Sequence, residues 1–410
     1  MLTHWLWLST RKELKDREIV AVLQYFGDPE SAYRGTEQAY RQVPGLSAKA
    51  LAGLADKSTE QAVQILRSCR REGIQILTWQ DPAYPARLKG IADPPVVLYY
   101  KGRLPDTVSA PLIGAVGTRS FSDYGMEMAR QLGYQLAQGG AVVVSGMAEG
   151  IDAGVTGGAL AAGGAVVGVL GCGVDVVYPA SNRQLYQSVT DRGCLISEFP
   201  PGTKPMRWHF PKRNRLISGI SNGVLVVEAP EKSGALITAR LAAEQGRDLF
   251  AVPGNANAPS CQGSNRLLRD GAVLVHTGQD ILEYYCHRYP RTVHCEGACP
   301  TAPELENLTH TMGVRSVPAV RKTRQTAPKE KKVIDNPIKP PYIDVEKKLS
   351  ALSEPERAIV QQLTAGPRLT DEVISGSGVP VAKAMSLLTM LEIKGLIKRL
   401  PGNLIALQEE

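Results

Sequence analysis

Short apolar runs that recur between residues 112 and 274 constrain the fold of this chain more than any other feature. Each run has the unbroken Val/Ile/Leu composition of a strand buried on both faces. Helical patterns such as 124–138 and 236–245 separate the runs. This alternation predicts an α/β domain with a doubly wound, mainly parallel sheet. The predicted strands are 112–116, 141–144, 165–170, 194–196, 224–227, 249–252 and 272–274.

The expected domain is Rossmann-like and covers residues 76–285 once its proline-rich lead-in is included. Within the lead-in, 96–100 has the composition of a short strand. Residues 1–75 predict a small helical domain. The turn Val-Pro-Gly-Leu-Ser at 43–47 is typical of a helix-hairpin-helix, whose turn amides either contact a DNA phosphate or serve packing alone.

The last third of the chain begins with a segment that lacks periodicity. Residues 286–348 are rich in proline and cations, which predicts a flexible basic linker. A further domain is expected over 349–410, where Ser353 and Glu356 form a capping box at a helix start. Two more helical patterns and a hairpin pattern at 396–407 follow. Three helices and a hairpin predict a winged-helix domain.

Glycine-bearing loops follow four of the predicted strands. Small residues there expose backbone amides, and the helix that follows adds partial positive charge, so such loops bind phosphate. Arg119 adds a guanidinium that can donate two hydrogen bonds to one phosphate. Because loops at the carboxyl ends of parallel strands line one crevice, the pattern predicts a phosphate site. The candidate residues are Gly117, Thr118, Arg119, Ser145, Gly146, Ser233 and Gly234, with Gly171-Cys172-Gly173 as a further loop.

Cations and aromatic residues are interleaved between positions 204 and 215. This composition suits single-stranded nucleic acid, because cations bind phosphates and rings stack on unpaired bases at about 1–3 kcal/mol each. The alternative is structural: Arg213 or Arg215 pairs internally, for instance with Glu228, and Phe210 belongs to the core. The candidate DNA-binding residues here are Lys204, Arg207, Phe210, Lys212, Arg213, Asn214 and Arg215.

The sequence signatures of catalysis and of cofactor binding are absent. No GxSxG, HExxH or Walker A sequence occurs, and no histidine stands in a nucleophile–base arrangement, so we expect no enzyme activity. We expect no dinucleotide cofactor, because there is no GxGxxG and no acidic residue after the second strand to hold a ribose. We also expect no metal: only one pair approaches the spacing of zinc ligands in the set Cys286, His287, His294, Cys295 and Cys299.

The composition agrees with a soluble cytoplasmic protein. A net charge of +7, from 47 basic and 40 acidic residues, permits a nucleic-acid partner without requiring one. Seven scattered cysteines do not form a disulfide framework and indicate a reducing compartment. The first ten residues lack the charge pattern of a secretory signal. Because glycines interrupt the most apolar segment, 159–170, we expect no membrane insertion.

Between residues 80 and 285 the chain carries, in order, the motifs Asp93-Pro94-Pro95, Val116-Gly117-Thr118-Arg119, Tyr124-Gly125, Ser145-Gly146-Met147-Ala148-Glu149-Gly150-Ile151-Asp152, Tyr178-Pro179, Ser197-Glu198, Phe210-Pro211-Lys212-Arg213-Asn214-Arg215, Val227-Glu228-Ala229, Ser233-Gly234-Ala235-Leu236-Ile237-Thr238-Ala239 and Val252-Pro253-Gly254. Together they resemble the DprA (Smf) family, the DNA-processing proteins of bacterial natural transformation. The resemblance implies a homodimer that coats incoming single-stranded DNA and delivers it to the RecA recombinase.

The same resemblance assigns roles to individual residues. The arginine of the family's VG(S/T)R motif corresponds to Arg119, and the pocket cation to Lys204 or Arg207. A base-contacting aromatic corresponds to Phe210. The histidine of the family's GIDxxxH pattern is Thr156 in this chain, which argues against proton chemistry at that position and favours a binding role.

Two other functions are compatible with the residues. One is a nucleotide-processing enzyme of the lysine-decarboxylase-like Rossmann class, whose glycine-rich loop carries a catalytic glutamate that the corresponding segment 233–238 lacks. The other is a duplex-DNA-binding regulator that acts through the winged helix. Its third helix carries Lys383 but no cluster of base-reading Asn, Gln or Arg. A chromatographic search for free base after incubation with nucleoside monophosphates would test the enzyme, and competition between single-stranded and duplex DNA would test the regulator.

Overall fold

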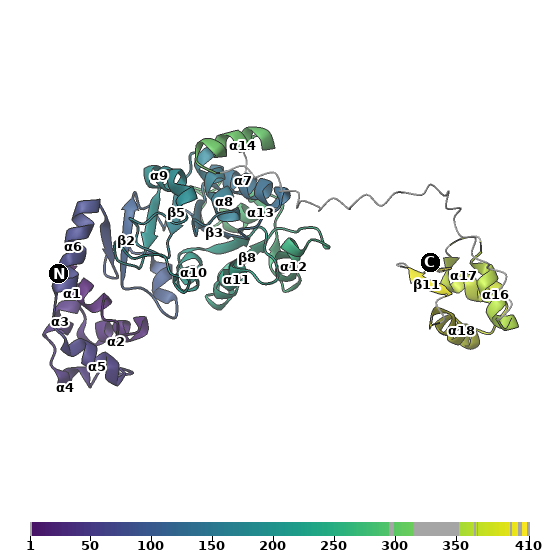
Figure 1. Ribbon diagram of the computed structural model, residues 1–410, viewed down its shortest axis with the longest axis horizontal. Coiled ribbons are helices and arrows are strands. Elements are labelled where there is room, and N and C mark those ends of the chain that lie inside the picture. Colours follow the sequence, from purple (N-terminus) through teal and green to yellow (C-terminus); the bar gives the residue numbers. More distant parts are fainter. Residues whose placement is uncertain are drawn as a thin grey trace, which may run out of the picture. The chain divides into compact units, whose positions relative to one another are not determined.

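The computed structural model describes residues 2–294, 299–314, 352–364, 366, 368–393, 396–400 and 404–407. The chain forms two compact units, Met1–Arg321 and Lys322–Glu410 (Figure 1). Within the described residues, no helix is both long and apolar enough to cross a membrane.

The first unit is built on a nine-stranded sheet. Its strands are β1 (Gln75–Thr78), β2 (Val97–Gly102), β3 (Leu112–Val116), β4 (Val142–Ser145), β5 (Val166–Val169), β6 (Cys194–Ser197), β7 (Gly223–Val226), β8 (Asp248–Ala251) and β9 (Val273–Leu274). Their order is β1-β2-β6-β5-β4-β3-β7-β8-β9. The strands from β6 to β9 in that order are parallel, and β2 and β1 continue one edge antiparallel. The predicted doubly wound, mainly parallel sheet is confirmed. The four-residue edge strand β1 has no apolar run that predicts it.

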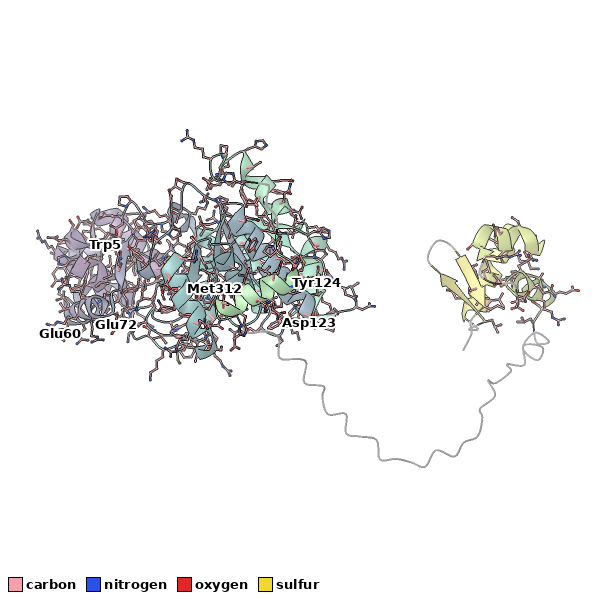
Figure 2. The ribbon with its side chains drawn as sticks, turned by 90° about the horizontal axis from the view of Figure 1, so that it is seen from above. Trp5, Glu60, Glu72, Asp123, Tyr124 and Met312 are labelled. Carbon is pink, nitrogen blue, oxygen red and sulfur yellow. The ribbon has the colours of Figure 1, made fainter. Side chains whose placement is uncertain are left out.

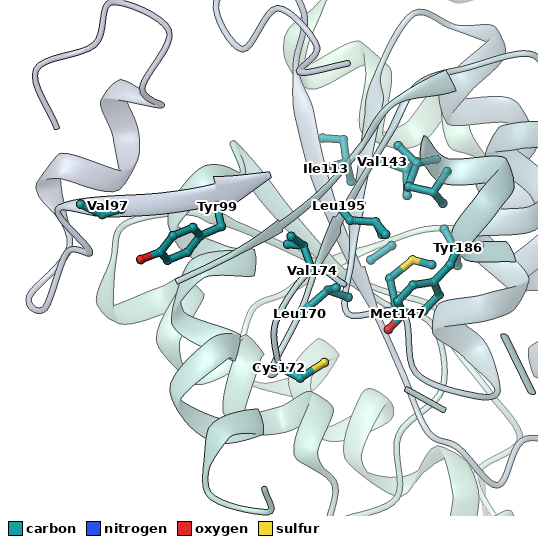
Figure 3. Close-up of a cluster of buried hydrophobic side chains, with 14 of the residues drawn as sticks. Val97, Tyr99, Ile113, Val143, Met147, Leu170, Cys172, Val174, Tyr186 and Leu195 are labelled. Carbon is teal, nitrogen blue, oxygen red and sulfur yellow. The ribbon is translucent and has the colours of Figure 1, made fainter. Parts of the chain in front are cut away.

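Helices cover both faces of this sheet, because side chains alternate along each strand. In β3, Ile113 and Ala115 enter one core, and Leu112 and Val116 enter the other. Figure 3 shows part of the first core, with Ile113 and Val143. The first face is covered by α7 (Asp123–Gln138), α8 (Ile151–Ala161), α9 (Arg183–Arg192) and α13 (Gly278–Cys286), the second by α10 (His209–Ile220), α11 (Gly234–Glu244) and α12 (Gln262–Arg269).

Six helices precede the sheet and share its first core. Figure 2 labels Trp5 among them. The helix-hairpin-helix-like turn lies between α4 and α5, where the Ser47 side chain caps α5 by accepting from the Ala50 amide at 3.2 Å. The Ser47 amide itself donates to the Glu18 carboxylate at 2.9 Å. This amide is therefore used within the protein. The helices are α1 (Leu2–Ser9), α2 (Asp16–Phe26), α3 (Pro29–Arg34), α4 (Glu37–Tyr40), α5 (Ala48–Ala55) and α6 (Glu60–Glu72).

Helix α14 (Ala302–Thr311) lies within the segment that the sequence predicts to be a linker. A capping box between Thr301 and Glu304 begins it, and it packs on α7 and α8 with Leu305 and Thr309 buried. Its apolar stripe is too short to produce a helical period, and tertiary packing stabilises it instead. The prediction of an unstructured 286–348 is therefore wrong for these residues, and its part from 315 to 348 lies outside the described residues.

The described residues of the second unit form three helices and a small antiparallel sheet in the order β10-β12-β11. Ile359, Val373, Leu388 and Ile405 meet in a core of its own. This arrangement confirms the winged-helix prediction. The elements are α16 (Glu354–Gln362), β10 (Arg368–Leu369), α17 (Thr370–Ser377), α18 (Val381–Ile393), β11 (Ile397–Leu400) and β12 (Leu404–Leu407).

Candidate nucleic-acid interface

A cavity of about 340 Å³ lies at the carboxyl ends of β3 and β7. These strands are neighbours, and the sheet continues in opposite directions from them, through β4 on one side and β8 on the other. The cavity therefore occupies the topological switch point, where doubly wound sheets bind ligands. The loop 117–120 after β3, the loop 230–234 after β7, and Phe210 and Asn214 of α10 line it.

The loops after β3 and β4 already hold an internal carboxylate. The buried Asp152 accepts from the Gly117 amide at 3.3 Å and from the Ala148 amide at 3.4 Å. Burial raises the pKa of Asp152, and the nearby Arg213 guanidinium and these amides oppose that shift. A side chain at Gly117 would place its Cβ 2.5 Å from the Ile151 side chain. Gly117 therefore serves the packing of α8, and its amide is not open to a phosphate.

The amino terminus of α7 is also closed by the protein itself. The Glu228 carboxylate accepts from the Ser122 amide at 2.9 Å, and the Ser122 hydroxyl accepts from the Gly125 amide at 3.0 Å. Thr118 is buried, and its amide donates to the Glu228 carbonyl at 2.8 Å. The positive end of this helix is thus neutralised internally, and Glu228 caps a helix instead of pairing with a cation of α10.

The amino terminus of α11 is the part of the cavity best suited to an anion. Gly234, its first residue, is exposed, and a Cβ there would meet nothing within 4 Å. The Ser233 hydroxyl caps the helix by accepting from the Ala235 amide at 3.2 Å. Lys232, beside them, is exposed and also lines the cavity. Backbone amides, the helix dipole and an ammonium group converge here. The loop sequence contains Lys232, but only the fold reveals that it faces the cavity.

A cation and two aromatic rings form the neighbouring rim. Arg119 is exposed, and its Cζ lies 5.8 Å from the centre of the Phe210 ring. The half-buried Phe210 packs on Tyr178, with 5.4 Å between ring centres and 36° between planes. Tyr178 is 40% exposed. Arg119 can therefore meet a phosphate while the ring pair offers a face on which a base can stack.

Three further candidates lie beneath the loops. The buried Arg213 donates to the Gly146 carbonyl at 2.6 Å and to the Val169 carbonyl, and its Nε donates to Asn214 at 3.2 Å. A Cβ at Gly146 would lie 2.6 Å from that guanidinium. The Ser145 hydroxyl is buried. Arg213 and Gly146 therefore fasten the loops to the sheet, although Arg213 also lines the cavity. Contact of Arg213, Ser145 and Gly146 with DNA stays a prediction from the sequence.

Two more cations of α10 bind carboxylates away from the cavity. Arg215 donates to Glu198 at 2.6 Å and to Asp16 at 3.0 Å. Lys212 lies 3.0 Å from Glu198 and 3.4 Å from Asp16. Lys212 and Arg215 therefore attach α2 to α10, and their contact with DNA stays a prediction from the sequence. Lys204 and Arg207 are exposed in the segment before α10, and neither lines the cavity.

Two positions considered for other chemistry lie elsewhere. Thr156 is fully buried in α8 and does not line the cavity, so the position gives no support to proton chemistry there. Within the described parts of the chain, no three His, Cys, Asp or Glu side chains are grouped as metal ligands. Cys295 lies outside the described residues.

Comparison with known proteins places these features in a family. Residues 75–286 match the family model of DNA recombination-mediator protein A, and residues 346–403 match the DprA winged helix domain. Protein Smf of Synechocystis sp. is 32% identical over 403 residues, which is 97% of each chain. DNA processing protein DprA of Bacillus subtilis is 40% identical over 238 residues, 58% of this chain and 80% of that protein. The X-ray structure of DprA from Streptococcus pneumoniae is similar with a TM-score of 0.62 and 32% identity, over 69% of this chain and 98% of that one. The chain therefore belongs to the DprA (Smf) family of DNA recombination mediators.

Proposed function

We propose that this chain binds single-stranded DNA across the switch-point cavity, protects incoming strands and loads the RecA recombinase on them during natural transformation. It acts as a homodimer in the cytoplasm. The observation that carries the proposal is the position of Arg119, an exposed guanidinium at the rim, 5.8 Å from an aromatic ring. Family membership supports the general role in DNA recombination.

The chemistry of the rim favours a polymer over a mononucleotide. Arg119 and Lys232 are separate cations on two different loops, so they suit successive phosphates of one strand. The aromatic pair of Phe210 and Tyr178 can stack on any base, because every base has a π face. Binding should therefore tolerate many sequences and depend strongly on salt.

The test is a fluorescence anisotropy titration of a labelled oligothymidylate at about 50 and 200 mM salt. Arg119→Ala is expected to weaken binding at least about 10-fold, as loss of a charge-assisted contact does, and to reduce the salt slope by about 0.7. Arg240→Ala is the matched control, since it removes an exposed arginine of α11 whose partner is Glu244. Equal affinities for wild type and Arg119→Ala would contradict the assignment of Arg119.

Loading and assembly need separate measurements. Recombinase assembly can be followed by its DNA-dependent ATP hydrolysis on strands coated beforehand with a single-strand binding protein. We expect this chain to shorten the lag and Arg119→Ala to do so less. Sedimentation velocity should show a dimer at micromolar concentration. A monomer at every concentration would contradict the homodimer.

The enzymatic alternative predicts release of free base from nucleoside monophosphates. Asp152 is the carboxylate that lines the 340 Å³ cavity within the described residues, and two loop amides engage it. We therefore expect no free base by chromatography.

The regulator alternative predicts tighter binding to duplex DNA than to single strands. We expect the opposite, so an excess of unlabelled duplex should compete poorly with the labelled single strand.

A further inference from the structure

A second hollow, of about 620 Å³, lies on the side of the sheet opposite the switch-point cavity, at the amino ends of the strands. Residues 107–109, which lead into β3, line it, as does Ile220, which ends α10 just before β7. Arg87, from the 3-10 helix Ala86–Gly90, and residues 288–292 after α13 complete the lining. The hollow is therefore at the amino ends of strands whose carboxyl ends form the switch-point cavity.

The lining of this hollow is basic. Arg87, Arg288 and Arg291 contribute to it, and no Asp or Glu does. Arg288 and Arg291 are exposed, and no carboxylate among the described residues lies within 4.0 Å of either guanidinium. Three uncompensated guanidinium groups around one hollow attract an anion.

Two acidic residues of the segments around this hollow, Asp106 and Asp248, already have partners. Asp106 accepts from the Val108 amide at 2.8 Å and from the Ser109 hydroxyl at 2.6 Å. Asp248, the first residue of β8, accepts from the Tyr285 hydroxyl at 2.7 Å. Neither carboxylate forms an ion pair with the arginines that line the hollow.

The site is organised before any ligand arrives. Arg87 donates to the Tyr289 hydroxyl at 2.9 Å, and Asn222 donates to the same oxygen at 3.0 Å. A hydroxyl that accepts twice still has one proton to donate. Arg247 donates to the Arg87 carbonyl at 3.1 Å, and its buried Nε has no partner within the described residues. Burial and the charge of Arg87 lower the pKa of Arg247, because both disfavour its charged form.

We propose that this hollow is a second phosphate-binding site. Arg87, which donates to Tyr289, is its fixed guanidinium, and Arg288 and Arg291 are its exposed ones. Its volume lies within the range of small-molecule sites, about 300–1,000 Å³, and exceeds what one phosphate needs. Two sources carry such phosphates: a free nucleoside triphosphate, or the backbone of a strand that continues from the switch-point cavity. The second source rests on the proposed function, and the first does not.

The experiment uses the full chain with Arg288→Ala and Arg291→Ala combined. Both side chains are exposed, so the fold should persist, and the melting temperature verifies this. The matched control combines Arg70→Ala with Arg71→Ala, which removes two exposed arginines from the last turn of α6. The two probes are ATP, measured by equilibrium dialysis, and a long oligothymidylate, measured by anisotropy with and without Arg119→Ala.

The two sources predict different results. If a strand fills the hollow, the double variant binds the oligothymidylate about 3- to 10-fold more weakly, with a salt slope reduced by about 1.4, and the control is unchanged. If a nucleotide fills it, ATP binding falls at least about 10-fold, as expected for loss of charge-assisted contacts, while strand binding persists. The ATP measurement remains valid even if wild type binds no strand, which separates this inference from the proposed function. Equal binding of both probes by double variant and control would overturn the proposal.

Discussion

The Arg215 guanidinium donates to the Asp16 carboxylate at 3.0 Å, which ties α10 of the sheet domain to α2 of the N-terminal helices. Glu198 accepts from the same nitrogen at 2.6 Å, and the side chains of Arg215 and Glu198 are 10% and 6% exposed. Because Arg215 and Glu198 are nearly buried, loss of one partner lowers the free energy of unfolding more than loss of one partner in a surface ion pair does.

Arg215→Ala is expected to lower the free energy of unfolding by about 3 kcal/mol, because it leaves buried carboxylates short of a partner. Lys212 still reaches both carboxylates, which keeps the loss at the lower end of the range for buried pairs. Urea denaturation measures the effect. Affinity for single strands should stay close to wild type, since Arg215 does not line the cavity. If Arg215→Ala were as stable as wild type but bound DNA poorly, Arg215 would be a DNA-binding residue and not a structural one.

Gly117 and Gly234 provide a matched pair of substitutions. Gly117→Ala forces a Cβ to within 2.5 Å of Ile151 and should cost about 1–3 kcal/mol of stability. Gly234→Ala adds a methyl group in open space, so stability should be unchanged or slightly higher, while strand binding falls because phosphate approach to the helix is hindered. Thermal melts and anisotropy on both variants measure the two effects. Wild-type strand affinity in Gly234→Ala would contradict the binding role of Gly234, and a wild-type melting temperature in Gly117→Ala would contradict the packing role of Gly117.

Phe210→Leu tests the aromatic face. Leucine keeps an apolar side chain against Tyr178 and removes the ring, so binding should weaken by about 1–3 kcal/mol with little change in melting temperature. Phe210→Tyr serves as control and should bind like wild type. Equal affinity of the leucine and tyrosine variants would exclude stacking at this position.

Glu18 gives a pH-dependent contribution to stability. Burial raises the pKa of this carboxyl, but hydrogen bonds from the Lys15 and Ser47 amides outweigh it, so the net pKa lies below the ordinary 4.5. A carboxyl whose pKa is lower in the folded state stabilises the fold at pH above its unfolded-state pKa. This stabilisation is lost as the pH falls through the folded-state pKa. Glu18→Gln should therefore cost about 2 kcal/mol at neutral pH.

The difference between wild type and Glu18→Gln should shrink as pH falls below about 4.5. Denaturation midpoints of both proteins across pH 3 to 7 measure it. A difference that stays constant throughout that range would show that the carboxylate charge at Glu18 does not stabilise the turn at Ser47.

The fold class follows from the sequence alone. Continuous apolar runs such as 112–116, in alternation with helical patterns, have the composition of strands buried on both faces. The capping box at Ser353 marks a helix start. The sequence also located the loops of the switch point, because short βα connections must lie at the carboxyl ends of their strands. The helix α14 was missed because long-range packing on α8, not local periodicity, stabilises it.

Which charged side chains remain available to a ligand depends on contacts that the folded chain makes. Arg119, Arg213 and Arg215 are the same residue type within one set of motifs, yet one is exposed and two are fastened to partners distant in sequence. The same holds for the loops: Asp152 and Glu228 engage the amides of two of them and leave the start of α11 open. The groups that engage these arginines and loop amides come from segments distant in sequence, so the local sequence does not reveal them.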